Sequence, residues 1–572
     1  METETSDPQG RSIVDGDAMG EILALAEGIS FWGGIDPDTG RIIDVHHPNH
    51  GASVAGKILM MPTSRGSCSG SGVLLELSLS RNAPAALVFS EREEILTLGA
   101  LVSDRIFGRP LPVVRLAHAA YKDLAQVPVA RLANGRITAP GLTINLKPME
   151  TGGVQLTDQD LALLGGEAGV AAQMAMEVIC RMAAADDVAC LTTVTRGHID
   201  GCILAHSANL VFAEKMAELG AQVSVPTTIN AISVDRENWQ RQGVAPDFGS
   251  RASRLADAYV RMGARPVFTC APYLLDKPPR KGEAIGWSES NAVIFANTVL
   301  GARTPKHPDY LDLFIAMTGR APMSGVYADA GRKAGVVLDV VIDAATVDDL
   351  FWPLLGWIAG RNASDRIPLI RGVARFNPSQ DDLKALCAAF GTTSGAPMLH
   401  IEGVTPEAHL APAKEAKYAK IEAADFEGAW RELNRGTKKI DLVSIGSPHA
   451  SGTELRRMIE LFTGRTRHPT TDIIVTVGRD VLRDASEDGT VEKLQAFGVR
   501  LLPDLCWCSI VEPVFPAQAQ GIITNSGKYA HYSHGLSGRH ARLGSLSDCI
   551  EAAVTGIAPP GPPAWMVAPY AP

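Results

Sequence analysis

The 572-residue sequence has no run that approaches the roughly 20 apolar residues needed to cross a membrane. Its first residues, Met1 to Asp7, are polar and acidic, whereas a secretory leader begins with basic residues and continues with apolar ones. It also lacks an excess of positive charge, since 63 acidic and 53 basic residues give a net charge of −10. These features argue against a membrane protein and against nucleic acid or anionic lipid as a partner. We expect a cytoplasmic protein.

Cysteine is scarce, and the nine cysteines do not form the dense disulfide framework of a small secreted protein. Reduced thiols are therefore available as soft metal ligands. Low-complexity tracts and repeats of fixed period are also missing. The whole sequence is 46% apolar and 20% charged, so it has enough apolar residues to form a buried core. Its length implies several domains.

The pattern of the chain changes near residue 150. Before that point, glycines and prolines separate short apolar stretches such as 56–62 and 111–116, which predicts a β-rich domain. Directly after it, Thr157 to Asp160 resembles a capping box that opens a helical stretch from Leu161 towards Met182. Farther on, strands and helices alternate over 188–194, 210–219, 222–225, 441–445, 452–462, 472–477 and 491–497. This alternation predicts an α/β fold with largely parallel strands, in two domains at 1–150 and 151–572.

Ligands in open α/β sheets bind beyond the carboxyl ends of strands, so polar segments that follow apolar ones are candidate sites. The first is the Gly/Ser-rich loop Arg65–Gly72, which follows an expected strand over 57–62. Its N–H groups and hydroxyls could bind a carboxylate or a phosphate. The loop lacks the Gly-Lys-Ser/Thr ending of a nucleotide-binding P-loop, and a flexible turn is the structural alternative.

Two further segments carry polar and charged side chains after apolar ones. His198 and Asp200 could act as an acid/base pair or hold ligands, and Asn230 could bind a carboxylate or hydroxyl; a structural histidine and a turn are the alternatives. Glu289 lies among polar neighbours, and Arg303 is suited to bidentate recognition of a carboxylate. Surface salt bridges would explain the last two equally well.

The remaining candidate site residues are three cysteines and a lysine. Cys506 and Cys508 stand one residue apart after an apparent strand, so both can face one site only if the backbone bends there. Cys270 ends another apparent strand and could supply a third sulfur to an iron–sulfur cluster. Buried, unreactive cysteines are the alternative. Lys528, in the polar segment Thr524–Tyr532 after a strand at 522–523, could bind an anion.

Together and in this order, the motifs resemble those of the aconitase X family over nearly the whole chain. Ser30–Gly40 and Arg65–Ser67 look like its small swivelling domain. The marks of its large domain are His198–Cys202, Pro226–Thr228, Thr269–Tyr273, Leu300–Thr304, Gly446–His449, the Cys506 region and Thr524–Tyr532. The resemblance implies a multi-layer α/β large domain with parallel sheets behind an N-terminal β-rich swivelling domain.

Members of this family occur with the two domains on separate chains or fused, and this chain has the fused order. The fused form implies dehydration of cis-3-hydroxy-L-proline to Δ1-pyrroline-2-carboxylate with no obligate second subunit; the two-chain form implies another small hydroxy acid, mevalonate 5-phosphate. In the two-chain pattern a cysteine stands at the position of Ser447 and an aliphatic residue at that of Cys508. The resemblance therefore implies a [2Fe–2S] cluster on Cys270, Cys506 and Cys508.

The resemblance further implies that Ser67 is the base that removes a proton from the substrate while iron assists the loss of hydroxide, at a site formed between the two domains. The expected substrate-binding residues are Arg65, Ser71, His198, Asn230, Glu289, Ser290, Arg303 and Lys528. Two functions of other classes stay open: a non-catalytic protein that holds an anion on the Ser67 loop, and an α/β enzyme with a nucleotide cofactor, although the glycine fingerprint of the latter is missing.

Overall fold

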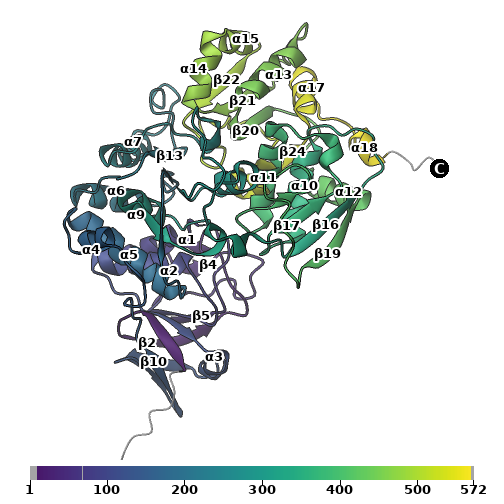
Figure 1. Ribbon diagram of the computed structural model, residues 1–572. Helices are drawn as coiled ribbons and strands as arrows, with labels where there is room; N and C mark the ends of the chain where they lie inside the picture. Colours follow the sequence, from purple (N-terminus) through teal and green to yellow (C-terminus); the bar gives the residue numbers. More distant parts are fainter. Residues whose placement is uncertain (1–8, 67, 568–572) are drawn as a thin grey trace, which may run out of the picture. The chain divides into compact units, whose positions relative to one another are not determined.

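The structure is a computed structural model that describes residues 9–66 and 68–567 (Figure 1). It divides into two compact units. Unit 1 combines the chain up to Thr227 with Ala258–Ala264 and His307–Ser324, and unit 2 combines Thr228–Asp257, Arg265–Lys306 and the chain from Gly325 onward. Within the described ranges, every helix is too short or too polar to cross a membrane.

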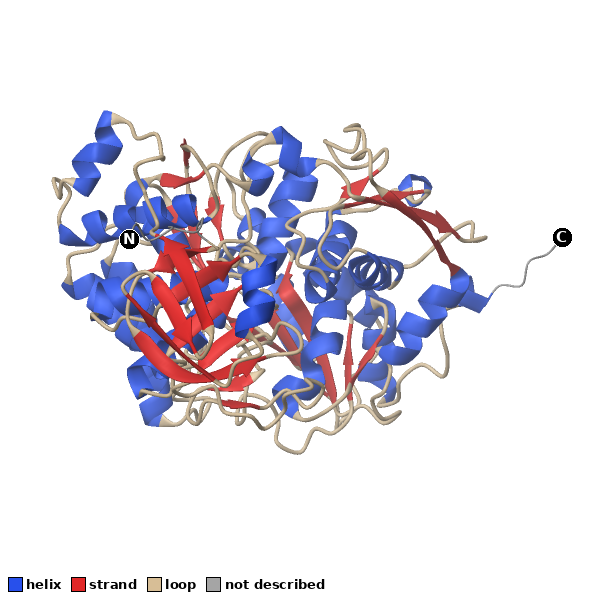
Figure 2. Ribbon diagram, turned by 90° about the horizontal axis from the view of Figure 1, so that it is seen from below, coloured by secondary structure: helices blue, strands red, loops and turns tan. Residues whose placement is uncertain are grey.

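Unit 1 begins with a closed β-barrel, the large group of strands near the N-terminus in Figure 2. Helices α1 (Gly70–Ser80) and α2 (Ile95–Phe107) connect three of its strands, which run parallel because each crossover passes through a helix. The predicted strands at 56–62 and 111–116 are β5 and β7. In barrel order the strands are β1 (Gly10–Val14), β10 (Leu142–Lys147), β9 (Arg136–Ala139), β8 (Val129–Ala133), β2 (Ala18–Ala24), β5 (Ile58–Met61), β6 (Ala86–Phe89) and β7 (Val113–Leu116).

The helical part of unit 1 starts at the predicted capping box. Thr157 Oγ1 accepts a hydrogen bond from the Asp160 N–H at 3.3 Å, and Asp160 Oδ2 accepts one from the Thr157 N–H at 2.9 Å. The predicted long helix is in fact two, α4 (Asp158–Leu164) and α5 (Val170–Ala185), because glycines interrupt it and Gly169 adopts a left-handed φ of 90°. The predicted strand at 222–225 is a bend.

The remaining elements of unit 1 are short. They are the pair β3 (Ile35–Asp36) and β4 (Arg41–Ile42), α3 (His118–Leu124), β11 (Leu191–Thr193), β12 (Gly197–Ile199), α6 (Ser207–Glu218), α9 (Leu311–Thr318) and β15 (Arg320–Pro322).

Unit 2 contains a four-stranded sheet in which every described pair is parallel. Its strands, in order, are β18 (His400–Ile401), β17 (Pro368–Arg371), β16 (Val336–Val341) and β19 (Lys417–Glu422). Figure 1 shows α10 (Phe351–Asn362), α11 (Gln380–Thr393) and α12 (Ala423–Glu432) next to this sheet. Their buried side chains pack with those of the sheet into one large apolar cluster.

A second parallel sheet of unit 2 has the order β22-β21-β20-β23-β24. Its strands are β20 (Leu442–Ala450), β21 (Asp472–Val477), β22 (Val499–Pro503), β23 (Ile522–Thr524) and β24 (Ala541–Leu543). Its helices are α13 (Gly452–Phe462), α14 (Arg479–Glu487), α15 (Thr490–Ala496), α16 (Gly527–Ser537) and α17 (Leu546–Thr555). The predicted ranges for β21 and α13 match, and the parallel sheets confirm the predicted α/β class.

The strand order of this sheet identifies where a ligand would bind. From β20 the chain first builds β21 and β22 on one side and then returns to build β23 and β24 on the other. The crevice beyond the carboxyl ends of the strands at such a switch point is the usual ligand site of an open parallel sheet. Cys506, Ser447 and Lys528 lie at or just beyond these carboxyl ends.

The other elements of unit 2 include β14 (Gly286–Trp287), α8 (Ser290–Phe295) and α18 (Ala564–Val567). The residues of β13 (Thr227–Ile229) and α7 (Pro246–Arg261) are divided between the two units.

Candidate functional site

The chain turns sharply where β22 ends. Asp504 adopts a left-handed φ of 70°, and Arg479 holds it by donating from Nε and Nη2 to its two carboxylate oxygens, both at 2.6 Å. A planar guanidinium paired with both oxygens fixes the direction of the turn. Cys506 and Cys508 follow immediately, so the predicted bend at this pair is confirmed.

The three predicted ligand cysteines come together inside unit 2. Cys270 and Cys506 are buried with Ala231 in a small cluster, and the partly buried Cys508 packs against it. The thiols of Cys270 and Cys508 both hydrogen-bond to the sulfur of Cys506. The Cys508 N–H also donates to Cys506 Sγ at 3.5 Å. We call these three residues the thiol centre.

The hydrogen bonds within the thiol centre distribute its protons unevenly. Those from Cys270 and Cys508, together with the charge of Lys528, lower the pKa of Cys506 well below its usual value despite burial. The same bonds, together with burial, raise the pKa of Cys270 and of Cys508. Because thiolate is the metal-binding form of cysteine, a metal held by these three sulfurs would displace their protons.

Cys270 does not end a strand, contrary to the sequence-based expectation. The segment before it is irregular, and Phe268 has a left-handed φ of 42°. Hydrogen bonds hold it instead: the Thr269 N–H donates to the Ile229 carbonyl at 3.3 Å, and Asn291 Nδ2 donates to the Cys270 carbonyl at 3.0 Å. The thiol is placed by tertiary contacts that no local pattern encodes.

A buried ion pair belongs to the electrostatic surroundings of the thiol centre. Lys528, in the first turn of α16, donates to Glu289 at 2.9 Å, and the two side chains are only 13% and 12% exposed. Burial favours the neutral forms, but the charge of Glu289 and of the thiolates raises the pKa of Lys528. The charge and hydrogen bond of Lys528 lower the pKa of Glu289. Asn230 Nδ2 donates to Glu289 at 3.3 Å. Three predicted substrate-binding residues thus form one group.

His449, at the end of β20, connects the two segments that carry the cysteines. Its Nε2 bonds the Leu505 carbonyl at 2.7 Å and its Nδ1 bonds Thr269 Oγ1 at 3.1 Å. A carbonyl only accepts, so Nε2 carries the proton. Burial lowers the pKa of His449, so the ring is neutral and Thr269 donates to Nδ1. The sequence placed His449 in a family motif but not among the site residues.

Ser447 occupies the position where the two-chain pattern has cysteine. Its carbonyl accepts a hydrogen bond from the Ser526 hydroxyl. Its own hydroxyl oxygen is buried and has no hydrogen-bond partner in the part of the chain that the structure describes. A buried hydroxyl in this condition points to a group that the protein itself does not supply.

The residues present fit an iron–sulfur cluster. Cysteine sulfurs are the usual ligands of such clusters. Lys528 supplies positive charge to balance an anionic centre, and burial excludes water. Cys270, Cys506 and Cys508 would hold the cluster.

Three other predicted substrate-binding residues, Arg65, Ser71 and His198, belong to unit 1. In unit 1, Arg65 pairs with Glu27 at 2.6 Å, and the hydroxyl of the fully buried Ser71 donates to the Ile95 carbonyl at 2.8 Å. His198 is buried in β12 of the same unit. Ser67, the predicted base, lies outside the described residues.

In unit 2, Arg303 donates to the Tyr327 carbonyl at 2.7 Å and pairs with Asp329. These partners lie outside the thiol centre and its ion pair. Ser290 is the first residue of α8, directly after Glu289.

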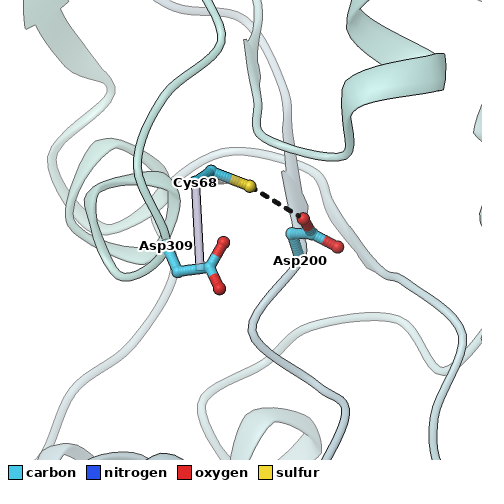
Figure 3. A group of neighbouring side chains, drawn as sticks. All are labelled: Cys68, Asp200 and Asp309. Atoms are coloured by element: carbon cyan, nitrogen blue, oxygen red, sulfur yellow. Dashed lines mark hydrogen bonds between the residues drawn. The ribbon is translucent and has the colours of Figure 1, made fainter. Parts of the chain in front are cut away.

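Unit 1 gathers a second set of candidate ligand side chains, those of Cys68, Asp200 and Asp309 (Figure 3). Cys68, Asp200 and Asp309 each bring one potential ligand atom within 4.8 Å of the others. Cys68 Sγ donates to Asp200 at 3.5 Å, and the Asp309 N–H donates to the Cys68 carbonyl at 3.3 Å. These bonds join Cys68 to two acidic residues that lie far from it in the sequence.

Comparisons with known proteins agree with this architecture. The family models described as the Aconitase X swivel, first, second and third domains match residues 7–139, 153–330, 334–431 and 440–555. A cis-3-hydroxy-L-proline dehydratase of Pseudomonas aeruginosa is 47% identical over 570 residues, 97% of this chain and 98% of its own. Another, from Hypocrea jecorina, is 44% identical over 567 residues, 96% of this chain and 95% of its own.

Among solved structures, the crystal structure of Thermococcus kodakaraensis aconitase X in its holo-form matches with a TM-score of 0.63 and 29% identity. The match covers 70% of this chain and all of that one. In this chain the swivel domain shares one polypeptide with the other three domains. The chain belongs to the aconitase X family, and it is an enzyme of the dehydratase class.

Proposed function

We propose that this enzyme dehydrates cis-3-hydroxy-L-proline. The proton on Cα and the hydroxyl on C3 leave as water, and the resulting enamine tautomerises to Δ1-pyrroline-2-carboxylate. The observation that carries the proposal is the combination, inside unit 2, of three convergent cysteine sulfurs with a buried Lys528–Glu289 pair. The long, highly identical dehydratase relatives point to the same substrate.

The charges of the ion pair match the substrate. Proline derivatives are zwitterions, with a carboxylate that would bind Lys528 and a ring ammonium that would bind Glu289. Both protein groups hold their charges at neutral pH, because each shifts the pKa of the other in that direction. A phosphate dianion, as in mevalonate 5-phosphate, would gain one attraction to Lys528 and meet repulsion from Glu289. The pair therefore favours an amino acid over a phosphorylated hydroxy acid.

We assign Cys270, Cys506 and Cys508 as the ligands of an iron–sulfur cluster of [2Fe–2S] type. Bound by these three residues, the cluster would supply Lewis-acid assistance to the loss of hydroxide. The chain's own part is to exclude water from the thiol centre and to orient the substrate through Lys528, Glu289 and Asn230. The nine free cysteines suit a reducing, cytoplasmic setting.

Ser67 is proposed as the base that takes the Cα proton. A serine hydroxyl is a very weak acid, so its alkoxide needs stabilisation by nearby donors, worth about 3–4 kcal/mol for one well-placed donor. Arg65, two residues before it, is the nearest cation in sequence, and its pairing with Glu27 would have to loosen for that role.

A substrate panel tests the proposal on anaerobically purified enzyme. We expect cis-3-hydroxy-L-proline to yield Δ1-pyrroline-2-carboxylate, and 4-hydroxyproline and mevalonate 5-phosphate to give no product. Ser67→Ala should abolish turnover but keep the visible iron–sulfur absorption. Faster turnover of mevalonate 5-phosphate would refute the substrate assignment, and an active Ser67→Ala enzyme would refute the base. A colourless, iron-free protein after anaerobic purification would remove the cluster from the proposal.

A further inference from the structure

We propose that His449 is a positioning residue that holds the two cysteine-bearing segments at the spacing one metal centre requires. This inference rests on the proposed function insofar as the thiol centre is assigned to a cluster. The two segments, Thr269–Cys270 and Leu505–Cys506, come from distant parts of the chain. Both are irregular, so a regular element fixes neither sulfur by itself.

Three hydrogen bonds of His449 reach these segments. Its ring binds the Leu505 carbonyl at 2.7 Å, one residue before Cys506, and the Thr269 hydroxyl at 3.1 Å, one residue before Cys270. Its backbone N–H donates to Cys270 Sγ at 3.4 Å. Thr269 Oγ1 also accepts from the Ala271 N–H at 3.1 Å, which fixes the peptide on the far side of Cys270. The completely buried ring therefore spans both segments with both nitrogens engaged.

The backbone of His449 is fixed from a third direction. Lys384, on α11, donates to the His449 carbonyl at 3.3 Å and pairs with Asp381 at 3.2 Å and with Glu454 of α13. Lys384 is only 3% exposed, so it is immobilised between the two helices. A residue anchored by its carbonyl, its N–H and both ring nitrogens can impose a fixed distance on the groups it binds.

The other described route between the cysteine segments is longer. It runs from the Thr269 N–H to the Ile229 carbonyl at 3.3 Å and, three residues on, from the Ile232 N–H to the Asp504 carbonyl at 2.7 Å. That path passes through an intervening peptide segment, whereas His449 bridges directly. Residues that orient metal ligands through such hydrogen bonds typically affect metal affinity by 10–100-fold.

Two variants test this role without relying on turnover. His449→Leu removes both ring hydrogen bonds. Thr269→Val keeps the shape of the side chain but removes one ring hydrogen bond together with the bond from the Ala271 N–H to the same oxygen. His400→Leu is the matched control, because His400 is also buried and bonds a backbone carbonyl, that of Arg332, at 2.7 Å. The full-length chain, stripped of iron, is titrated with Cd²⁺, whose binding to thiolates is followed by ultraviolet charge-transfer absorption. We expect Cd²⁺ affinity to fall 10–100-fold in His449→Leu, less in Thr269→Val and not at all in His400→Leu.

The iron-loaded variants give a second readout. We expect His449→Leu to hold less iron and sulfide per chain and Thr269→Val to shift the midpoint potential of the remaining cluster. Unchanged affinity and potential in both variants would overturn the inference, and so would equal losses in His400→Leu, because the effect would then be general destabilisation. If His449→Leu does not fold, the Cd²⁺ affinity and the midpoint potential of Thr269→Val alone test the inference. Failure of the wild-type chain to bind Cd²⁺ would instead refute the ligand assignment of the proposed function.

Discussion

At the scale of single residues, positions 447 and 508 decide which sulfurs are available to a metal. Cys508 lies against the buried pair Cys270 and Cys506, and its thiol hydrogen-bonds to Cys506. Ser447 offers a hydroxyl in place of a thiol, and that hydroxyl stays buried without a partner in the described chain. Under the proposed ligand set, this chain would keep three sulfurs by using position 508 in place of position 447.

Removal of the Cys508 sulfur should therefore prevent the thiol centre from holding iron. We expect Cys508→Ala to lose most of its iron and acid-labile sulfide, measured per chain after anaerobic reconstitution. Cys549→Ala makes the same atomic change at a fully buried site in α17, outside the thiol centre, and should keep the wild-type content. Equal iron content in the two variants would mean that Cys508 is not a ligand.

The Lys528–Glu289 pair has two separable roles, one in stability and one in substrate binding. Lys528→Met leaves Glu289 buried without its cation and should lower the free energy of unfolding by about 3–5 kcal/mol. It should also reduce kcat/KM at least about 30-fold, since a buried charge partner is worth 2 kcal/mol or more. Adding Glu289→Gln should restore most of the stability and none of the activity. Urea unfolding and steady-state kinetics on all four forms complete the cycle, and recovered activity would show that the pair is only structural.

At the scale of elements, the C-terminal end of α5 is tied to the barrel through Asp187. Three arginines pair with this carboxylate: Arg11 of β1 at 2.5 Å, Arg115 of β7 at 3.2 Å and Arg92 at 3.3 Å. Burial alone would raise the pKa of Asp187, but the hydrogen bond and charge of Arg11 and the charges of the other two lower it. A lowered pKa means that the folded state favours the ionised form. The resulting stability is present above the unfolded pKa near 3.9 and is lost as the pH falls through the lower folded value.

Asp187→Asn should accordingly lower the thermal midpoint at pH 7, and its difference from the wild type should shrink below about pH 4. Asparagine tolerates the left-handed φ of 56° at this position, so the substitution adds little backbone strain. The effect should also weaken in high salt, because the pairs are partly exposed. Asp247→Asn, at an exposed aspartate of α7, serves as the control with no expected shift. A midpoint difference that is independent of pH would refute the electrostatic explanation.

At the scale of the whole molecule, the boundary between the barrel and the rest of unit 1 is a surface turn. Gly152 and Gly153 are exposed, and an added Cβ at either would touch nothing within 4 Å. Contacts across this boundary within unit 1 include the Asp187 pairs and the bond from Cys68 to Asp200. Exposed turns of this kind usually tolerate cleavage.

A protease site inserted between Gly152 and Gly153 should therefore be cut without loss of function. We expect the two pieces to elute together in size-exclusion chromatography and to keep most of the dehydratase activity, compared with the same variant before cleavage. Pieces that separate, with activity lost, would show that the covalent link is required. Retained activity would mean that the reaction does not need the covalent link that distinguishes the fused from the two-chain arrangement of the family.

The local secondary structure could be predicted from sequence patterns. Periodicity and capping residues place β21, α13 and the start of α4, because these patterns record the burial and hydrogen bonding of neighbouring residues. The alternation of strands and helices predicted the α/β class, and the family resemblance implied that three cysteines serve as ligands. The sequence could not show that Phe268 turns the chain through a left-handed conformation, since phenylalanine rarely adopts one. Aspartate adopts this conformation more often, but an aspartate alone does not say that Asp504 does so.

Which of the candidate residues lie together became clear from the three-dimensional fold. Asn230, Glu289 and Lys528 form one group, whereas Arg303 binds Tyr327 and Asp329 away from it. His449 joined the site although its sequence context set no role for it. The physical reason is that these contacts link segments far apart in the chain. Their proximity depends on the order of parallel strands and on irregular turns, and a one-dimensional pattern of apolar and polar residues contains neither.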